Sequence, residues 1–336
     1  MKVRATQAIL ECLLEQEVDT VFGYPGGTIL NLYDELYHYQ DKIHHILTAH
    51  EQGASHAADG YARSTGKVGV CFATSGPGAT NLTTGIATAY MDSSPVVFIT
   101  CNVTEETLGK DAFQEVDITG IAMPISKATY LVRDPQTIPD VMRQAFAVAA
   151  TGRPGPVLID IPIDVQEQTL KKFHYPETVN IRGYKPSVKG NELQIKRVVE
   201  AIARSKQPLI CAGGGVWLAG AQKELLELAE RASIPVVKTM MGIGLMPTDH
   251  PLNMGMVGAH GNHCANQALA KADLLIMVGT RAADRAMVDP RDIQRRMATI
   301  HIDVDPAEIG KNMQAAIPLV GDVKVILRQL QIGRAH

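Results

Sequence analysis

The sequence predicts an α/β fold made of two doubly wound, parallel-sheet domains. Short apolar runs alternate with helical segments along the whole chain, and repeated strand-helix pairs form parallel sheets with helices on both faces. Several of these runs end in glycine-rich turns, which is typical of a strand that leads into a helix. A length of 336 residues suits two such domains of about 150 residues each.

The first domain is predicted over residues 1–166. It opens with an amphipathic helix over 7–16, for which Thr6 is the expected cap. The strands expected after it are 20–23, 46–49, 68–74, 95–101 and 157–161, and the helices are 28–37, 54–62 and 138–150. This order of elements predicts crossovers of one hand in a parallel sheet.

A polar, proline-containing passage over 167–190 is the predicted linker to the second domain, which covers 191–331. In the second domain we expect helices over 193–204 and 219–232, and strands over 208–212, 236–238, 274–278 and 299–303. The triple glycine Gly213-Gly214-Gly215 separates the first of these strands from the next helix.

Composition excludes several function classes. Lys and Arg total 32 against 35 for Asp and Glu, without a basic block, so nucleic acid is not an expected partner. No apolar stretch is long enough to span a membrane, and the first helix leaves no room for a signal peptide. The cysteines are odd in number and form no C-x-x-C pair, so we expect no metal site and buried thiols in a reducing cytoplasm: Cys12, Cys71, Cys101, Cys211 and Cys264.

Glu51 is the first candidate for chemistry. It lies where a predicted strand ends and a small-residue helix begins, and open α/β sheets bind ligands at this edge. Its position alone favours the simpler interpretation, a solvated first-turn carboxylate that the helix dipole stabilises.

Two further strand ends are expected beside Glu51. Tyr24-Pro25-Gly26-Gly27 and Ser75-Gly76-Pro77-Gly78 each follow a strand, and the carboxyl ends of parallel strands meet at one edge. The triple glycine of the second domain could bring backbone amides close to a phosphate, or it could be a tight structural turn. It is not a complete G-x-G-x-x-G fingerprint, because Leu218 occupies the place of the last glycine.

In this order, these elements resemble thiamine-diphosphate-dependent 2-oxoacid enzymes, and most closely the acetolactate synthase large-subunit family. The resemblance covers nearly the whole chain. It rests on the motifs at residues 21–27, 50–54, 74–81, 111–115, 152–157 and 301–311.

The resemblance implies an activity. Members of this family decarboxylate pyruvate on thiamine diphosphate and condense the product with a second 2-oxoacid, giving 2-acetolactate or 2-aceto-2-hydroxybutyrate in branched-chain amino-acid biosynthesis. The first domain is then the pyrimidine-binding domain. The second is a central domain that binds FAD as a structural group.

The resemblance also implies roles for residues of the first domain. Glu51 is the catalytic residue, which hydrogen-bonds a ring nitrogen of the pyrimidine and should lie in an apolar pocket. Tyr24, Pro25, Gly26 and Gly27 lie near the thiamine. Phe113 and Gln114 face the substrate pocket from a neighbouring subunit, although plain core packing is the competing explanation for Phe113.

A larger set of positions matches those that bind FAD in the family. The arginines among them could pair with phosphate and ring oxygens, whereas His260 could equally be an ordinary loop histidine. The set is Arg153, Gly213, Gly214, Gly215, Thr239, Gly258, His260, Gly279, Arg281, Arg285, Asp303 and Asp322.

The chain departs from the family at Asn102, Thr104, Ile163, Ala282 and Ala283, and the last three leave FAD retention and acceptor preference open. It also has no Gly-Asp-Gly, the motif that with a downstream Asn holds Mg²⁺ on the diphosphate in a third domain. We therefore expect a chain truncated before that domain and inactive alone. Residues 332–336 fit no family pattern and are expected to be a non-native tail.

The expected partners are pyruvate and 2-oxobutyrate, further copies of the chain in a homodimer or homotetramer, and a regulatory small subunit. Two alternatives remain open. One is another thiamine-dependent lyase, such as a 2-oxoacid decarboxylase or a sulfoacetaldehyde acetyltransferase. The other is a non-catalytic two-domain module that binds flavin or a partner protein.

Overall fold

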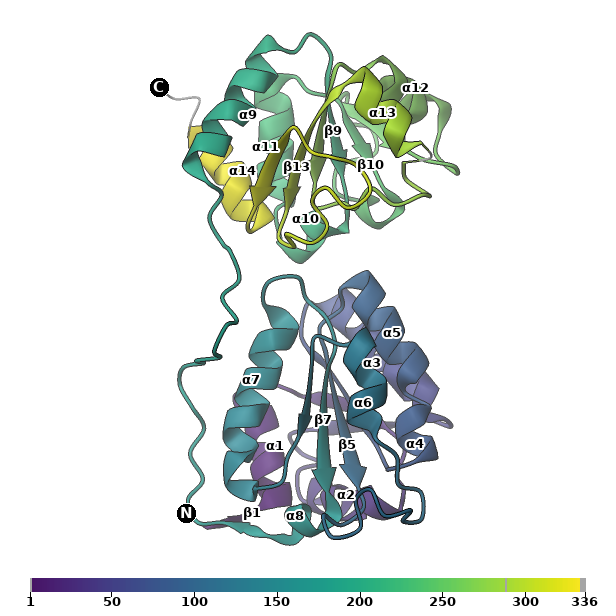
Figure 1. Cartoon of the computed structure of the whole chain (residues 1–336), viewed down its shortest axis with the longest axis vertical. Coiled ribbons are helices and arrows are strands. Elements are labelled where there is room, and N and C mark those ends of the chain that lie inside the picture. Colours follow the sequence, from purple (N-terminus) through teal and green to yellow (C-terminus); the bar gives the residue numbers. More distant parts are fainter. Residues whose placement is uncertain (1, 288, 333–336) are drawn as a thin grey trace. The chain divides into compact units, whose positions relative to one another are not determined.

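The computed structural model describes residues 2–287 and 289–332, and it divides into two units, residues 1–184 and 185–336. Each unit is built around a six-stranded parallel sheet with helices on both faces (Figure 1). The predicted fold class is confirmed. All of the predicted tail 332–336 except its first residue lies outside the described part of the chain.

The sheet of the first unit has the strand order β3-β2-β4-β5-β7-β6, and every neighbouring pair is parallel. In that order the strands are His44–Leu47, Thr20–Gly23, Gly69–Ala73, Val96–Asn102, Val157–Pro162 and Ala128–Leu131. The chain places β3 on one side of β2 and β4 on the other. The gap between β2 and β4 is therefore the topological switch point of this sheet.

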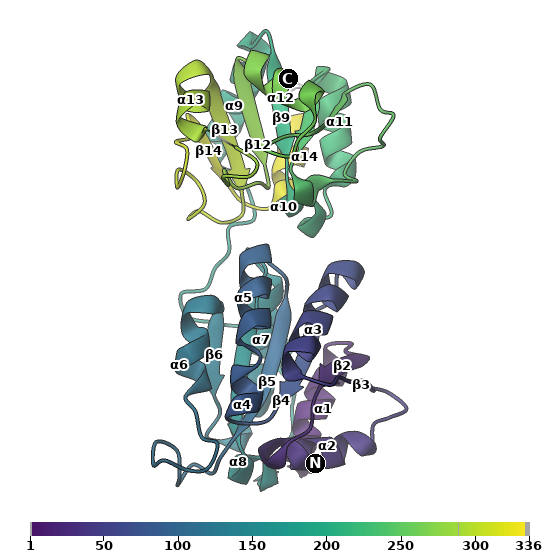
Figure 2. The same ribbon diagram turned by 90° about the vertical axis from the view of Figure 1, so that its right-hand side faces the viewer.

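Helices cover both faces of this sheet (Figure 2). One face is packed by α1 (Ala5–Glu15), α2 (Leu30–Tyr37) and α7 (Ile138–Ala150), which bury the larger apolar cluster of this unit. The other face is packed by α3 (Glu51–Thr65), α5 (Thr83–Asp92) and α6 (Ile118–Ala122). Shorter elements are η1 (Gly27–Ile29), α4 (Pro77–Thr80), η2 (Met123–Ile125), η3 (Pro135–Thr137) and α8 (Ile163–Glu167).

The sheet of the second unit has the order β11-β10-β9-β12-β13-β14, again parallel throughout. Its strands are Asn253–Met256, Val236–Lys238, Pro208–Ala212, Leu274–Val278, Ala298–Asp303 and Ile317–Val320. Helices α9 (Glu192–Arg204), α11 (Gln222–Ala232) and α14 (Val323–Ile332) cover one face, and α12 (His263–Lys271) and α13 (Pro290–Arg296) cover the other. Short helices α10 (Gly214–Leu218) and η4 (Met240–Gly242) follow β9 and β10.

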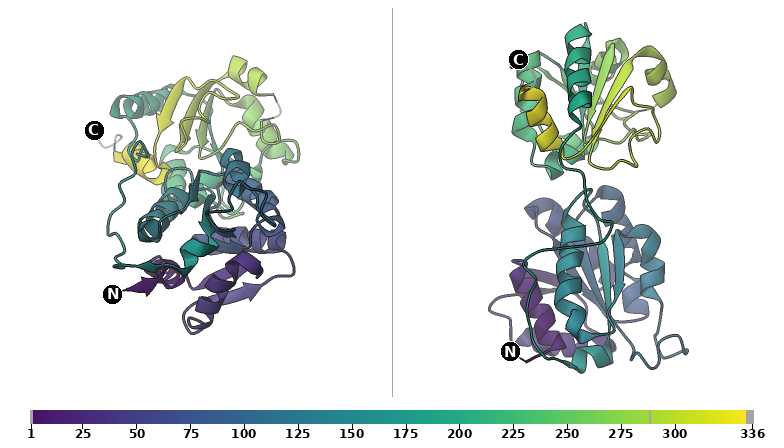
Figure 3. Two further views of the ribbon diagram at one scale, coloured as in Figure 1. Left: turned by 60° about the horizontal axis from the view of Figure 1, so that its bottom comes forward. Right: turned by 60° about the vertical axis from the view of Figure 1, so that its left-hand side comes forward.

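Some predicted element boundaries were wrong. Thr6 does not cap the first helix, because α1 already begins at Ala5 and Arg4 is the residue before it. Arg4 is held in the two-residue strand β1 (Val3–Arg4), which pairs antiparallel with β8 (Thr169–Leu170), so the chain enters the helix directly from a strand (Figure 3). The helix predicted over 219–232 starts at Gln222, because the turn before it is already used by α10.

Residues 167–184, the first part of the predicted linker, pack on the first unit. Phe173, Tyr175 and Tyr184 contact its apolar core. The Tyr184 hydroxyl also donates a hydrogen bond of 2.8 Å to the carbonyl of Thr151. Among the described residues, no helix is both long and apolar enough to cross a membrane.

Candidate functional site

Three strand ends meet at the switch point of the first unit, as predicted. Gly26 and Gly27 follow β2, Glu51 follows β3, and the turn at Ser75-Gly76 follows β4. Because β3, β2 and β4 are parallel neighbours, their carboxyl ends form one continuous edge. This edge is where an open α/β sheet binds its ligand.

Thr28 holds this edge together. Its hydroxyl lies 2.9 Å from the Thr74 hydroxyl and accepts a hydrogen bond of 3.1 Å from the Ser75 amide. The same hydroxyl bonds to the carbonyl of Cys101 at the end of β5, and Gln166 donates to the Thr28 carbonyl. One side chain therefore ties the ends of β2, β4 and β5 into a fixed arrangement.

Glu51 is the first residue of α3 and is 8% exposed. Asn81, at the end of α4, donates a hydrogen bond of 3.0 Å to its Oε2. Oε1 has no hydrogen-bond donor among the residues that the structure describes, and a Cβ added to Gly78 would lie 3.2 Å from it. A buried carboxylate thus keeps one oxygen open beside a glycine, so a ligand with a ring nitrogen could approach it.

Close packing requires two of the glycines at this edge, Gly26 and Gly78. A Cβ on Gly26 would lie 2.4 Å from Thr74 Cγ2, and one on Gly78 would lie 2.6 Å from the same atom. Gly27 has open space around its Cα, and Tyr24 is 41% exposed. The predicted thiamine residues therefore lie at the accessible side of the same edge as Glu51.

The loop that carries Phe113 and Gln114 also reaches this edge. A Cβ on Gly76, whose φ is +57°, would lie 2.5 Å from the Gln114 carbonyl oxygen, so the loop packs on the turn after β4. Phe113 is 85% exposed, and the alternative that it is a core residue is wrong. Its exposure leaves the ring free to contact a ligand or another chain.

The predicted FAD positions of the second unit gather at its own carboxyl edge. They follow all six strands: Gly213, Gly214 and Gly215 after β9, Thr239 after β10, Gly258 and His260 after β11, Gly279, Arg281 and Arg285 after β12, Asp303 at the end of β13 and Asp322 after β14. The switch point of this sheet lies between β9 and β12, which carry the triple glycine and Gly279.

Packing explains the glycines at that switch point. A Cβ on Gly213 would lie 2.5 Å from the Gly279 carbonyl oxygen, and one on Gly215 would lie 2.7 Å from Gly279 Cα. The Gly215 amide donates a 2.9 Å hydrogen bond to the same carbonyl. The two turns can cross this closely only because neither carries a side chain.

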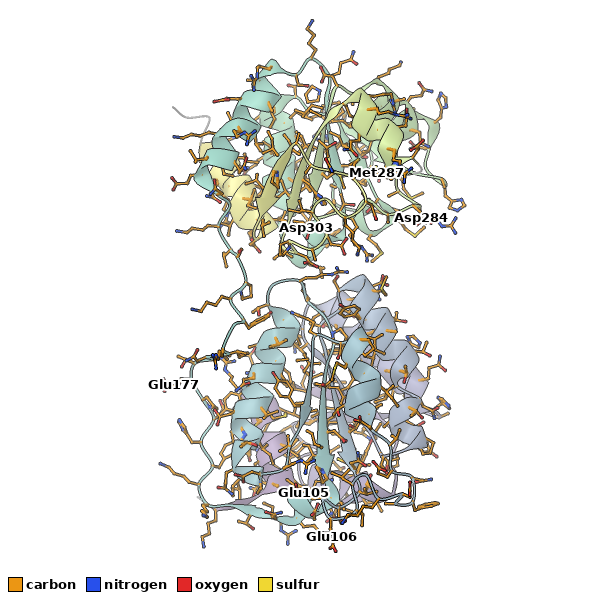
Figure 4. The ribbon with its side chains drawn as sticks, viewed as in Figure 1. Glu105, Glu106, Glu177, Asp284, Met287 and Asp303 are labelled. Atoms are coloured by element: carbon orange, nitrogen blue, oxygen red, sulfur yellow. The ribbon has the colours of Figure 1, made fainter. Side chains whose placement is uncertain are left out.

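Charged side chains of this edge differ in how far they are fixed. Asp303 is 8% exposed, and its Oδ1 accepts a 2.9 Å hydrogen bond from the Asp305 amide. Asp303 lies at the end of β13, and Asp284 and Met287 lie in the segment after β12 (Figure 4). Arg285 pairs at 3.7 Å with exposed Asp284, and His260 is exposed.

His301 is buried in β13, and this burial lowers the pKa of its imidazole. The Thr280 carbonyl accepts a hydrogen bond of 3.0 Å from the imidazole, which opposes the lowering only in part.

Arg153 belongs to the first unit, apart from the other eleven predicted FAD residues. It lies in the loop before β7, where its Nε donates a 2.8 Å hydrogen bond to Ser93. The departures Ala282 and Ala283 follow Arg281, and their carbonyls accept hydrogen bonds from Asn312 and Met287. Ile163 is the first residue of α8.

Sequence reasoning missed Thr28, Thr74 and Asn81 as members of the first site. Thr74 and Asn81 stand inside a recognised motif, but nothing in the sequence shows that they contact Thr28 or Glu51. Their roles arise from contacts between segments 30 or more residues apart.

Comparison with known proteins agrees with this geometry. Residues 3–121 match the family model described as "Thiamine pyrophosphate enzyme, N-terminal TPP binding domain", and residues 195–330 match "Thiamine pyrophosphate enzyme, central domain". The chain belongs to the thiamine pyrophosphate enzyme family. The strand ends around Glu51 fall in the first matched region, and the triple glycine falls in the second.

Within this family the chain is most usefully compared with three relatives. It is 52% identical over 330 residues to the "Probable acetolactate synthase large subunit" of Methanocaldococcus jannaschii, covering 98% of this chain and 56% of the relative. It is 49% identical to an acetolactate synthase of Arthrospira platensis (97% and 57%) and 48% identical to one of Mycobacterium leprae (98% and 52%). The chain spans about half the length of the curated relatives it matches.

Proposed function

We propose that this chain forms the pyrimidine-binding and central parts of the catalytic subunit of an acetolactate synthase. The observation that carries the proposal is the carboxylate of Glu51, buried at the switch point with Oε1 open and Oε2 held by Asn81. Relatives of similar sequence are named acetolactate synthase, which supports the choice of reaction. The substrates would be pyruvate and a second 2-oxoacid.

Thiamine diphosphate, when bound, supplies the electron sink that decarboxylation of a 2-oxoacid requires. The side chains present fit its pyrimidine. Because Asn81 donates to Oε2, that oxygen acts as an acceptor, and the proton that Glu51 holds or shares would lie on Oε1. Gly78 leaves space beside that atom, and Thr28 keeps the ends of β2, β4 and β5 in place.

The central part would bind FAD along the carboxyl edge of its sheet. The triple glycine and Gly279 bring backbone close together at the switch point, and Arg281 and Arg285 supply positive charge at the same edge. Mg²⁺ and the diphosphate would be held by residues that lie outside this chain. The assembly would contain at least two copies, would pair with a regulatory small subunit and would act in the cytoplasm.

A chimera tests the reaction. Residues 1–331 are joined to the remaining part of the Methanocaldococcus jannaschii relative, and the products formed from pyruvate are measured. Acetolactate is expected, and Glu51→Gln should reduce its formation to background. Acetaldehyde without acetolactate would instead indicate a decarboxylase, and no turnover by a chimera that binds thiamine diphosphate would indicate a non-catalytic module.

Flavin binding is tested on the 336-residue chain itself. After incubation with FAD and gel filtration, the protein should retain the visible absorbance of the flavin. Arg281→Ala should weaken this retention, whereas Arg204→Ala on the exposed end of α9 is the matched control and should not. Equal flavin loss in both variants would contradict the assignment of Arg281.

A further inference from the structure

A polar cluster is buried in the middle of the first sheet. Thr100 and Asn102 lie on β5, Asp160 lies on β7, and Thr100 pairs in register with Asp160. Their exposed fractions are 0%, 3% and 2%. A carboxylate at this depth costs free energy unless its oxygens are hydrogen-bonded, so the structure must supply donors for it.

Both oxygens of Asp160 accept a short hydrogen bond. The Thr100 hydroxyl donates to Oδ1 and the Asn102 amide nitrogen donates to Oδ2, and each donor–acceptor distance is 2.7 Å. Among the described residues, Asp160 has no ion-pair partner. Burial raises the pKa of Asp160, and the two hydrogen bonds only partly oppose that rise. An unpaired buried acid weakens a sheet core, so its presence points to a purpose other than stability.

Asn102 connects this acid to the loop over 103–117. Its side-chain oxygen accepts a 2.9 Å hydrogen bond from the Val103 amide, at the beginning of the loop. Its side-chain nitrogen donates a hydrogen bond of 3.3 Å to the Val116 carbonyl, at the end of the loop. Because the Asp160 carboxylate accepts this hydrogen bond, the Asn102 atom that faces it is the amide nitrogen. The carboxylate therefore sets the orientation of the Asn102 amide toward the loop.

The loop that starts and ends at Asn102 carries Phe113 and Gln114. Its first turn is held where the Glu105 amide donates to both oxygens of Asp164, and Glu105 and Glu106 lie near the end of the unit where β5 and β7 finish (Figure 4). Further along, it packs through Gln114 against the Gly76 turn. The loop therefore joins the buried cluster to the edge that contains Glu51.

We infer that Asp160 and Asn102 are positioning residues, which orient the 103–117 loop so that Phe113 and Gln114 contact the second 2-oxoacid. The role in substrate contact rests on the function proposed above. The role in holding the loop rests on the hydrogen bonds alone. Asp160 acts through Asn102 and does not itself contact the substrate.

Hydrogen exchange on the 336-residue chain tests the role in holding the loop. Four amides are hydrogen-bonded within the loop, those of Thr107, Leu108, Lys110 and Glu115. In Asn102→Ala they should exchange about tenfold faster, because loss of a buried hydrogen bond lowers the cost of local opening. Asp160→Ala should act in the same direction, since it removes the acceptor of the Asn102 amide nitrogen.

Thr100→Val is the matched control. It removes the other hydrogen bond of Asp160 but no contact of the loop, so exchange in the loop should change by less than about twofold. Unchanged exchange in Asn102→Ala, or an equal rise in Thr100→Val, would overturn the inference. If Asp160→Ala does not fold, the comparison of Asn102→Ala with Thr100→Val still decides whether Asn102 holds the loop.

Kinetics of the chimera test the role in substrate contact. Asn102→Ala should raise KM for the second 2-oxoacid about tenfold while kcat stays within about twofold, because loop placement affects binding before chemistry. Thr100→Val should leave both constants near those of the parent. An unchanged KM in Asn102→Ala would contradict this role. An inactive parent chimera would contradict the proposed function, whereas the exchange result would still decide whether Asn102 holds the loop.

Discussion

Asn81 Nδ2 lies 3.0 Å from Glu51 Oε2, and this hydrogen bond joins the end of α4 to the start of α3. Because of this hydrogen bond, the two oxygens of the Glu51 carboxylate have different surroundings. Oε2 is held by the protein, and Oε1 faces the position beside Gly78. Asn81 is therefore the residue that orients the candidate catalytic group.

Removal of this hydrogen bond should reduce turnover without loss of the fold. Asn81→Ala frees the Glu51 carboxylate to rotate, and kcat of the chimera should fall about 10- to 100-fold, the range expected for one hydrogen bond to a charged group. Steady-state formation of acetolactate measures this. Thr80→Ala, which removes only a local bond to the Pro77 carbonyl, is the control. Equal rates for Asn81→Ala and the parent would show that Asn81 does not orient Glu51.

Gly76→Ala should destabilise the first unit more than Gly109→Ala does. Both glycines have positive φ, +57° and +71°, so both substitutions carry a backbone cost, and Gly76 also has a ψ of −120°, which lies outside the left-handed helical region. Only at Gly76 would the new Cβ also meet backbone, 2.5 Å from the Gln114 oxygen, whereas nothing lies within 4 Å at Gly109. Thermal unfolding of the two variants measures the difference. Equal melting temperatures would mean that the loop does not pack on the turn.

Phe113→Ala should leave stability within about 0.5 kcal/mol, as expected for a surface substitution. Phe98→Ala is the contrast, because Phe98 is fully buried on β5 and its truncation should cost about 3–5 kcal/mol. Denaturant unfolding followed by circular dichroism measures both. A large loss in Phe113→Ala would mean that the ring is buried against the chain after all.

Acidification should destabilise the second unit through His301. Burial lowers the pKa of this imidazole below its ordinary value of 6.5, so between the folded and unfolded pKa values the unfolded chain binds more protons. His301 therefore leaves the free energy of unfolding unchanged above pH 6.5, and this free energy falls as the pH drops below 6.5. Each unit by which the pKa is lowered corresponds to about 1.4 kcal/mol.

His301→Gln should flatten this dependence, and chemical unfolding at pH 7.5 and pH 5.5 measures it. His45 in β3 also has a lowered pKa because of burial, so it contributes a slope of the same sign in the first unit. His45→Gln is therefore the control that separates the two units. An unchanged slope in the second unit of His301→Gln would contradict the prediction.

Strands buried on both faces could be predicted from the sequence to within one residue of their observed bounds. Strands β9, β10 and β12 were predicted at those bounds, because a central parallel strand is a continuous apolar run between turn residues. The edge strands β6, β11 and β14 were not predicted. They are short, only partly buried, and two of them contain Gly or Pro, so the local pattern is weak.

For the candidate sites, the sequence predicts only the sheet edge at which the residues lie. The glycine turns and parallel order place Glu51 beside Gly26 and Gly76 without any structure. The partners Thr28, Thr74 and Asn81 were not predictable, because each acts through a contact between distant segments. Phe113 shows the same limit, since an aromatic residue in a polar loop gives no sign of whether it is buried or exposed.

The pairing of Val3 with Leu170 brings the beginning of the first unit next to the segment that follows its sheet. The chain therefore begins the unit beside the segment that follows β7, the last strand of the six-stranded sheet along the chain. Such a unit can be inserted, exchanged or circularly permuted as one cassette without rethreading its neighbours. The two-residue ladder of β1 and β8 marks the place where the chain would be cut and rejoined for such an exchange.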